Sequence, residues 1–209
     1  MRRPPPDGFI EAIGANAERR AQVEAYRVML ARANAQMNLV GESTLGDFWR
    51  RHFIDSAQLA WFAPRARVWA DIGSGAGLPG IILAILMKGR PGARVHLIES
   101  VGKRARFLAD VAARLDLPVT LHNARAESLR LSVEVVTARA CAPLTRLLGF
   151  AHPFIDRGAR GLFLKGREAG AEIEAARARW RFRLEMHESL SDPSGRVLSV
   201  TELAHAAKP

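Results

Sequence analysis

From residue 64 onward, short runs rich in β-branched residues alternate with segments of helical periodicity. The short runs predict strands at 67–72, 94–99, 119–122, 133–138 and 161–165, and the segments between them predict helices at 79–88, 102–115, 144–154 and 168–179. Strands that are joined through helices run parallel, and such connections are right-handed. The alternation therefore predicts an α/β fold in which helices cover both faces of a mainly parallel sheet.

The part of the chain before this alternation follows a helical pattern. Residues 9–62 show helical periodicity, and a first long helix is predicted to end in a turn at 38–41. A second helix is predicted to begin with Ser43 or Thr44 as its N-cap. Residues 1–63 are thus expected to be a helical N-terminal extension, and its proline-rich start, residues 1–8, is expected to be flexible.

The end of the chain has a third pattern. From Arg179 to Met186, charged and apolar residues alternate, which predicts a strand with one buried face and one solvated face. A turn at 192–195 and a second strand at 196–201 complete an antiparallel hairpin. The arginines at 177, 179, 181 and 183 could contact RNA, although a solvated strand face explains them better.

Length and composition allow a single sizeable core. With 209 residues, of which 48% are hydrophobic, residues 64–209 are predicted to form one domain that packs with the extension as a single compact unit. The chain has one cysteine and no apolar run long enough to cross a bilayer, so a cytoplasmic protein without membrane contact is expected. A net charge of +10 favours a polyanionic partner such as nucleic acid, although coding bias toward arginine would also produce it.

The strongest chemical signal is a glycine-rich run at the point where the first of these strands turns into a helix. It reads Ala70-Asp71-Ile72-Gly73-Ser74-Gly75-Ala76-Gly77-Leu78-Pro79-Gly80. Glycines let the backbone adopt positive φ and approach a ligand, and the amides at the start of a helix point toward that ligand. Pro79 suits the first helical position because it has no N–H group to leave without a partner. The run predicts a loop that holds a small ligand.

The position of an acidic residue indicates which ligand this is. Gly75, Gly77 and Gly80 match the dinucleotide pattern G-x-G-x-x-G, but they begin three residues after the strand ends, which is too late for a pyrophosphate turn. The register that fits the strand is Asp71-x-Gly73-x-Gly75-x-Gly77, with a carboxylate at the mouth of the loop. A carboxylate there would repel a pyrophosphate and favour a cationic ligand such as S-adenosylmethionine. NAD is the alternative cofactor.

Residues after the next two strands agree with this ligand. Glu99 ends the second strand, where a carboxylate can accept hydrogen bonds from both ribose hydroxyls of either cofactor. Ala126 and Glu127 follow the third strand, which places them near an adenine ring. Taken in strand order, these residues predict an S-adenosylmethionine site along the carboxyl edge of the sheet.

The residues after the fourth strand narrow the type of methyl acceptor. The segment 137–143 lacks the Asn or Asp followed by Pro-Pro that suits methylation of an exocyclic amino group. Cys141 is the only candidate for the nucleophile that C5 methylation of a pyrimidine requires, and a buried structural role is expected for it. A ring nitrogen such as guanine N7 has an available lone pair, so no catalytic acid or base and no metal site is predicted, and positioning supplies the acceleration.

Six segments carry a further signal. They are Asn38-Leu39-Val40, Arg51-His52-Phe53-Ile54-Asp55-Ser56, the glycine-rich run, Glu99-Ser100-Val101-Gly102-Lys103-Arg104, Val136-Thr137-Ala138-Arg139-Ala140 and Leu164-Lys165-Gly166. Together they resemble the bacterial 16S ribosomal RNA methyltransferase G family (RsmG, formerly GidB), from about residue 35 to the end of the chain. The Arg-His-x-x-Asp-Ser segment and the Leu-Pro-Gly extension of the glycine loop make the resemblance specific, because methyltransferases in general lack them.

The resemblance implies a Rossmann-like class I S-adenosylmethionine-dependent methyltransferase with a seven-stranded sheet, which methylates guanosine N7 in the 530 loop of 16S rRNA. The cofactor contacts of the family fall on Gly73, Leu78, Ala126, Glu127 and Arg139, and the loop analysis adds Asp71, Gly75, Gly77 and Glu99. Arg139 could hold the methionine carboxylate, stack on the target base or hold a phosphate, and an ion pair within the protein is the alternative.

Basic residues near the predicted mouth are candidates for contacts with RNA phosphates. They are Arg50, Arg51, His52, Lys103, Arg104, Arg106 and Lys165. Naked 16S rRNA, the small ribosomal subunit and an assembly intermediate all remain open as substrates, and the oligomeric state is also open, with a monomer expected. The alternative functions are methylation of a small molecule or a protein, and RNA binding without catalysis.

Overall fold

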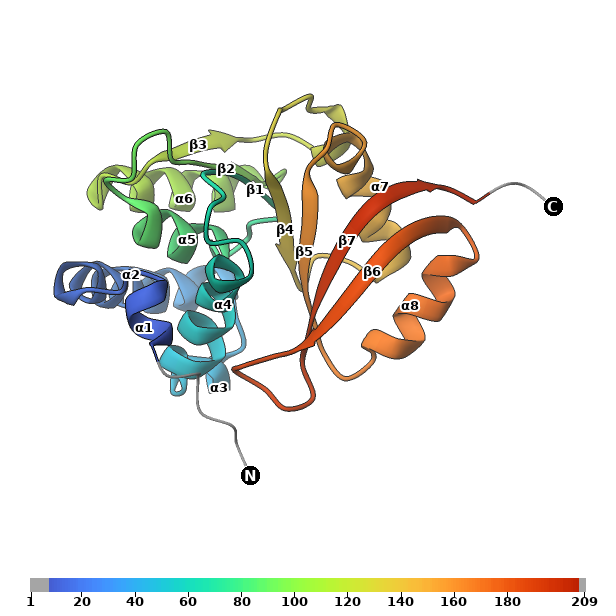
Figure 1. Cartoon of the computed structure of the whole chain (residues 1–209). Helices are drawn as coiled ribbons and strands as arrows, with labels where there is room; N and C mark the ends of the chain where they lie inside the picture. The colour runs from blue at the N-terminus through green and yellow to red at the C-terminus, as the bar shows by residue number, and fades with distance from the viewer. Residues whose placement is uncertain (1–7, 207–209) are drawn as a thin grey trace.

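The computed structural model describes residues 8–206, which contain one seven-stranded sheet (Figure 1). In sheet order its strands are β3 (Val119–His122), β2 (Arg94–Ile98), β1 (Val68–Ile72), β4 (Val135–Arg139), β5 (Arg160–Lys165), β7 (Arg196–His205) and β6 (Trp180–Glu188). The first five are parallel, and β7 is antiparallel to both of its neighbours. The strand order reverses at β1 and β4, and open α/β sheets bind ligands outside the carboxyl ends of the strands at such a point.

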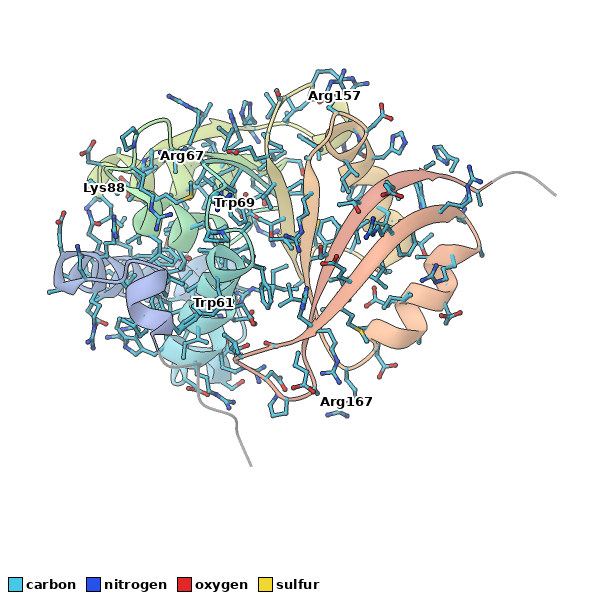
Figure 2. The ribbon with its side chains drawn as sticks, viewed as in Figure 1. Trp61, Arg67, Trp69, Lys88, Arg157 and Arg167 are labelled. Carbon is cyan, nitrogen blue, oxygen red and sulfur yellow. The ribbon has the colours of Figure 1, made fainter. Side chains whose placement is uncertain are left out.

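Helices cover both faces of the sheet. One face carries α2 (Ala17–Met37), α4 (Asp55–Phe62), α5 (Gly80–Met87) and α6 (Gly102–Arg114), and the other carries α7 (Leu144–Ile155) and α8 (Ala169–Arg177). Neighbouring residues of β1 belong to different apolar clusters: Trp69, labelled in Figure 2, packs with the first set of helices, and Ala70 packs with the second. This is the alternation expected of a strand that is buried on both faces.

The N-terminal extension packs directly on the first face. Four shorter helical segments complete the architecture: α1 (Phe9–Ala12), α3 (Glu42–Leu45), a π-helical segment (Trp49–Ile54) and a 3-10 turn (Ala126–Ser128). Phe9 and Tyr26 belong to the same apolar cluster as the strands, so the extension shares a core with the sheet. Most of the predicted flexible tail lies outside the described residues. No helix within residues 8–206 has the length and apolar character needed to cross a bilayer.

The predicted α/β elements agree closely with the structure. Every bound of the five predicted parallel strands and four predicted helices lies within two residues of the observed bound. At the glycine loop, the helix predicted to begin at Pro79 is α5, which begins one residue later, at Gly80. The period of the hydrophobic residues was therefore sufficient to locate these elements.

The predicted start of the second N-terminal helix was wrong. Ser43 and Thr44 lie inside the short helix α3, and Gly41 precedes it. The Thr44 hydroxyl donates to the carbonyl oxygen of Gly41 at 2.6 Å and lies 2.9 Å from Nε2 of His52. Because this hydroxyl bonds a carbonyl and a distant side chain, it does not cap a helix, and the chain continues into the π-helical segment before α4 begins.

The alternation predicted for the C-terminal strand holds only in its first half. Trp180 and Phe182 are buried, whereas the side chain of Met186 is 54% exposed. The sheet ends at β6, and the apolar cluster that takes Trp180 and Phe182 reaches Leu184 only at its margin. Arg183 agrees with the prediction of a solvated strand face: its side chain is 67% exposed and pairs with the exposed Glu202 at 3.5 Å.

Candidate functional site

A cavity of about 960 Å³ lies at the carboxyl edge of the sheet. Its walls come from the glycine loop, the ends of β4 and β5, the N-terminal segment from Leu39 to Asp55, and the turn between β6 and β7, which contributes Ser191, Asp192 and Gly195. The turn reaches this edge because β6 runs in the same direction as β5. Segments from both ends of the chain thus complete a site whose base is the parallel sheet.

The glycine loop has the left-handed backbone that was predicted for it. Gly73, Gly75 and Gly77 have φ values of +66°, +53° and +93°. A Cβ atom on Gly77 would lie 2.5 Å from Cγ1 of Ile81, so packing against α5 also requires glycine there. A Cβ atom on Gly75 would meet only the carbonyl oxygen of Gly73, at 3.6 Å. The backbone at Gly75 therefore borders open space in the cavity, which leaves room for a ligand.

The prediction that the Asp71 carboxylate lies at the mouth of the loop was wrong. The Asp71 side chain is completely buried beneath the loop, where Oδ2 accepts a hydrogen bond from the backbone N–H of Gly80 at 3.1 Å. The other oxygen, Oδ1, is buried without a hydrogen-bond partner among the described residues. Burial raises the pKa of this carboxyl to about 7. Asp71 therefore fastens the loop to the start of α5, and its charge is not displayed on the surface.

Glu99 also supports the loop. Its side chain is 4% exposed, and its two oxygens accept hydrogen bonds from the backbone N–H groups of Gly75, at 2.9 Å, and Val101, at 2.7 Å. Each carboxylate oxygen can accept a further hydrogen bond, so Glu99 retains the capacity for the predicted contact with ribose hydroxyls. Ala126 is buried and Glu127 is exposed, and neither they nor Glu99 line the cavity. The residues predicted to contact the adenosine part of the cofactor thus lie outside this cavity.

Arg139 ends β4 and lines the cavity, as predicted. Its Nη1 atom donates to the carbonyl oxygen of Arg51 at 3.0 Å and to Oδ2 of Asp55 at 3.2 Å, and lies 3.1 Å from Nδ1 of His52. The side chains of Arg139 and Asp55 are each 17% exposed. The ion pair that sequence analysis had treated as the alternative role is therefore present, and it joins the sheet to the N-terminal extension.

His52 cannot serve as a cationic phosphate contact in this structure. The residue is 4% exposed, and burial together with the neighbouring Arg139 guanidinium lowers its pKa to about 4. A neutral imidazole that accepts the Arg139 bond at Nδ1 carries its proton on Nε2, which then donates to the Thr44 hydroxyl. The prediction for His52 was wrong because the sequence could not show that this residue turns inward.

Lys165 ends β5 on the opposite wall of the cavity. Its ammonium group donates to the carbonyl oxygen of Ala142 at 2.8 Å and pairs with Oε2 of Glu172 at 2.6 Å, and the lysine side chain is 9% exposed. The thiol of Cys141 lies in the same wall, against Gly73, and burial raises its pKa above the usual range. A protonated thiol is a poor nucleophile, which agrees with the structural role expected for Cys141.

The other predicted phosphate contacts are divided between the cavity and the outer surface. Arg51 and Arg104 line the cavity, whereas Arg50, Lys103 and Arg106 do not. Arg167, which sequence analysis missed, is exposed directly after β5 at the same edge, while Arg67 and Arg157 lie at the opposite edge (Figure 2). Positive charge is therefore present on both edges of the sheet, and only a part of it surrounds the site.

Three further residues matter to the site and were not predicted in this role. Tyr26, on α2, donates from its hydroxyl to the carbonyl oxygen of Ala76 in the glycine loop at 2.7 Å. Asp55 pairs with Arg139, and Glu172 pairs with Lys165. Asp55 lies in the Arg-His-x-x-Asp-Ser segment, which was the one available signal. Tyr26 falls within the predicted long helix, where no local pattern indicates a contact with the glycine loop, and nothing in the sequence distinguishes Glu172 from other helix-surface acids.

The arrangement suits binding and positioning of a ligand more than proton transfer. Arg51, Arg139 and Lys165 in the cavity wall are each paired with a carboxylate, and His52 is held between two partners. Among the described residues no group of three His, Cys, Asp or Glu side chains is arranged to hold a metal ion. A ligand that carries an amino group and a carboxylate would meet groups of both charges here.

Solved structures that are similar in fold to this chain include methyltransferases. A putative O-methyltransferase from Klebsiella pneumoniae aligns with a TM-score of 0.59 and 14% identity, over 86% of this chain and 89% of its own. A SAM dependent methyltransferase from Aquifex aeolicus aligns with a TM-score of 0.56 and 16% identity, over 76% of this chain and 95% of its own. At these identities the likeness establishes the fold, the Rossmann-like sheet with a C-terminal antiparallel hairpin.

Relatives of known name are much closer in sequence. Proteins named Ribosomal RNA small subunit methyltransferase G are 54% identical in Caulobacter vibrioides, over 94% of this chain and 91% of theirs, and 43% identical in Rhodospirillum rubrum, over 96% and 99%. A family model described as rRNA small subunit methyltransferase G matches residues 19–196. The match therefore includes the whole glycine loop, the extension from residue 19 within α2 onward, and the turn between β6 and β7.

Proposed function

Because the chain belongs to the rRNA small subunit methyltransferase G family, we propose that it transfers the methyl group of S-adenosylmethionine to guanosine N7 in the 530 loop of 16S rRNA. The family membership carries the reaction type and the class of substrate. The methylated atom and the loop are the finer parts of the proposal, and they rest on the resemblance of the sequence motifs and on the chemistry of the site.

The observation that supports the cofactor best is the open space above Gly75. The loop backbone is held by Glu99 on one side and lacks any side chain toward the cavity on the other. Around this space the cavity is lined by the carboxylates of Asp55, Glu172 and Asp192 as well as by Arg139 and Lys165. The residues present therefore fit a ligand with an amino group and a cationic centre.

S-adenosylmethionine supplies a methyl group on a positively charged sulfur, which guanine N7 attacks with its own lone pair. The protein then has to hold the two reactants in line and exclude water, which is worth up to roughly 7 to 11 kcal/mol for well-oriented groups. Arg139 contributes here because its three contacts all use Nη1, so that Nη2 and Nε bond no described residue. A guanidinium edge of this kind can hold a carboxylate or a phosphate.

Lys165, Glu172 and Asp192 line the part of the cavity that we assign to the guanine base. A guanine base presents donors at N1 and N2 and an acceptor at O6, so side chains of both charges match it. We assign phosphate contacts to Arg51 and Arg104 inside the cavity and to Arg50, Lys103 and Arg106 on the surface nearby. We further propose that the protein acts as a monomer in the cytoplasm, where its ribosomal substrate is assembled.

The proposal is tested with 16S rRNA from cells that lack this protein. Purified enzyme and labelled S-adenosylmethionine are added to small ribosomal subunits and to naked 16S rRNA, and the label is located by mass mapping. We expect N7-methylguanosine at one site in the 530 loop. Transfer to another atom would disprove the assignment to N7, and transfer only to protein or to a small molecule would disprove an RNA substrate. Stabilisation of the fold by NADH and not by S-adenosylmethionine would disprove the cofactor.

A further inference from the structure

The Arg-His-x-x-Asp-Ser segment surrounds one nitrogen atom of Arg139. The Nη1 atom contacts the carbonyl oxygen of Arg51 at 3.0 Å, Nδ1 of His52 at 3.1 Å and Oδ2 of Asp55 at 3.2 Å. The π-helical segment that ends at Ile54 brings these residues to the same side of the chain. A segment more than 80 residues distant in sequence therefore determines where the Arg139 guanidinium lies.

The Asp55 carboxylate is fixed from both sides. Oδ2 accepts from Arg139, and Oδ1 accepts from the hydroxyl of Ser191 at 2.6 Å. Ser191 belongs to the turn between β6 and β7, and its hydroxyl also lies 2.9 Å from that of Ser189. Asp55 thus connects the extension, the end of β4 and this turn in one hydrogen-bonded chain, and its carboxylate has little freedom to rotate.

We propose that Asp55 is a positioning residue: it holds Nη1 of Arg139 so that Nη2 and Nε remain available to the anionic carboxylate of the methionine part of the cofactor. This inference rests on the proposed function, because it takes S-adenosylmethionine as the ligand. It also gives a role to the Arg-His-x-x-Asp-Ser segment, in which Asp55 supplies the charge and His52 the neutral acceptor. A neutral partner in place of Asp55 would let the guanidinium turn away from the cavity.

The test measures the Kd for S-adenosylmethionine by calorimetry in Asp55→Asn, Arg139→Lys and the double variant. We expect Asp55→Asn alone to raise the Kd about tenfold, and to have almost no further effect in the Arg139→Lys background, because paired residues are not additive. Asp110→Asn is the matched control, since Asp110 forms an Arg–Asp pair with Arg114 at 3.0 Å on the exposed face of α6. It should leave the Kd unchanged.

Several outcomes separate this inference from its alternatives. An equal increase of Kd in both backgrounds, or no increase in Asp55→Asn, would overturn the positioning role. If Asp55→Asn does not fold, Asp55→Glu keeps the charge but displaces it, and a raised Kd at a wild-type melting temperature gives the same decision. Failure of the enzyme to methylate rRNA would overturn the proposed function while these Kd values still decide the role of Asp55. A wild-type protein that does not bind S-adenosylmethionine would overturn both.

Discussion

The two sides of the carboxyl edge are held in place by different means. On the side of β1 and β2, the glycine loop is fixed by bonds between its own backbone and the carboxylates of Asp71 and Glu99, with partners 9 and 24 residues away. On the side of β4 and β5, charged side chains are fixed by ion pairs: Arg139 pairs with Asp55, 84 residues away in the N-terminal extension, and Lys165 pairs with Glu172 of α8, 7 residues away. The first side therefore depends mainly on backbone conformation, and the second depends on ion pairs between side chains of different elements.

The largest loss of stability from a substitution on the loop side is expected for Gly77→Ala. The new Cβ would lie 2.5 Å from Ile81 and 3.0 Å from Leu108, so α5 or the loop must move. We expect the free energy of unfolding to fall by about 3 kcal/mol, measured by chemical denaturation. Gly75→Ala is the control, because its φ is also positive but its Cβ has space, and it should cost about 1 kcal/mol. Equal losses would show that φ alone, and not packing, makes glycine necessary.

On the opposite side, Lys165→Met should cost about 2 kcal/mol of unfolding free energy, because it leaves Glu172, which is only 26% exposed, without its cation. The control is Arg114→Met, which removes a surface pair whose side chains are 67% and 54% exposed and should cost about 0.5 kcal/mol or less. Thermal and denaturant unfolding measure both. A loss for Lys165→Met no greater than that of the control would contradict the view that buried ion pairs hold this wall.

A pH titration of stability examines the buried acid of the loop. The folded pKa of Asp71 is about 7, above the ordinary value of 3.8, so between these values the folded state holds a proton that the unfolded state has lost. The free energy of unfolding of the wild type, taken relative to Asp71→Asn, should therefore fall as pH rises from about 4 to about 7, by at most about 1.4 kcal/mol per pH unit. Above pH 7 the difference should be constant. A difference that rises with pH would contradict the buried position of this carboxyl.

The smallest effect is expected for Tyr26→Phe, which removes one buried hydrogen bond to the loop carbonyl of Ala76. We expect a loss of about 1 kcal/mol of unfolding free energy and a several-fold higher Kd for S-adenosylmethionine. Thr137→Val is the matched control: its buried hydroxyl donates to the carbonyl oxygen of Leu162 at 2.7 Å, outside the glycine loop. It should lower stability by a similar amount without changing the Kd. An unchanged Kd in Tyr26→Phe would indicate that the extension does not support the loop.

The same contrast explains what sequence analysis could predict. The strands, the helices between them and the glycine loop follow from periodicity and from neighbouring residues, and they agree with the structure. The positions of Asp71 and His52 were wrong, because their burial depends on elements that pack over them. The pairing of Arg139 with Asp55 could be named only as an alternative, since it joins residues that no local pattern relates.

The reversed direction of β7 has a consequence for how the site can change during evolution. Because β7 is antiparallel to β6, the chain that leaves β6 at the carboxyl edge returns at once through a short turn, without a helix that crosses a face of the sheet. This turn, residues 189–195, contributes Ser191, Asp192 and Gly195 to the wall of the cavity. Insertions or substitutions in this turn would leave the strand register intact. New target preferences could therefore arise there without rebuilding the catalytic scaffold.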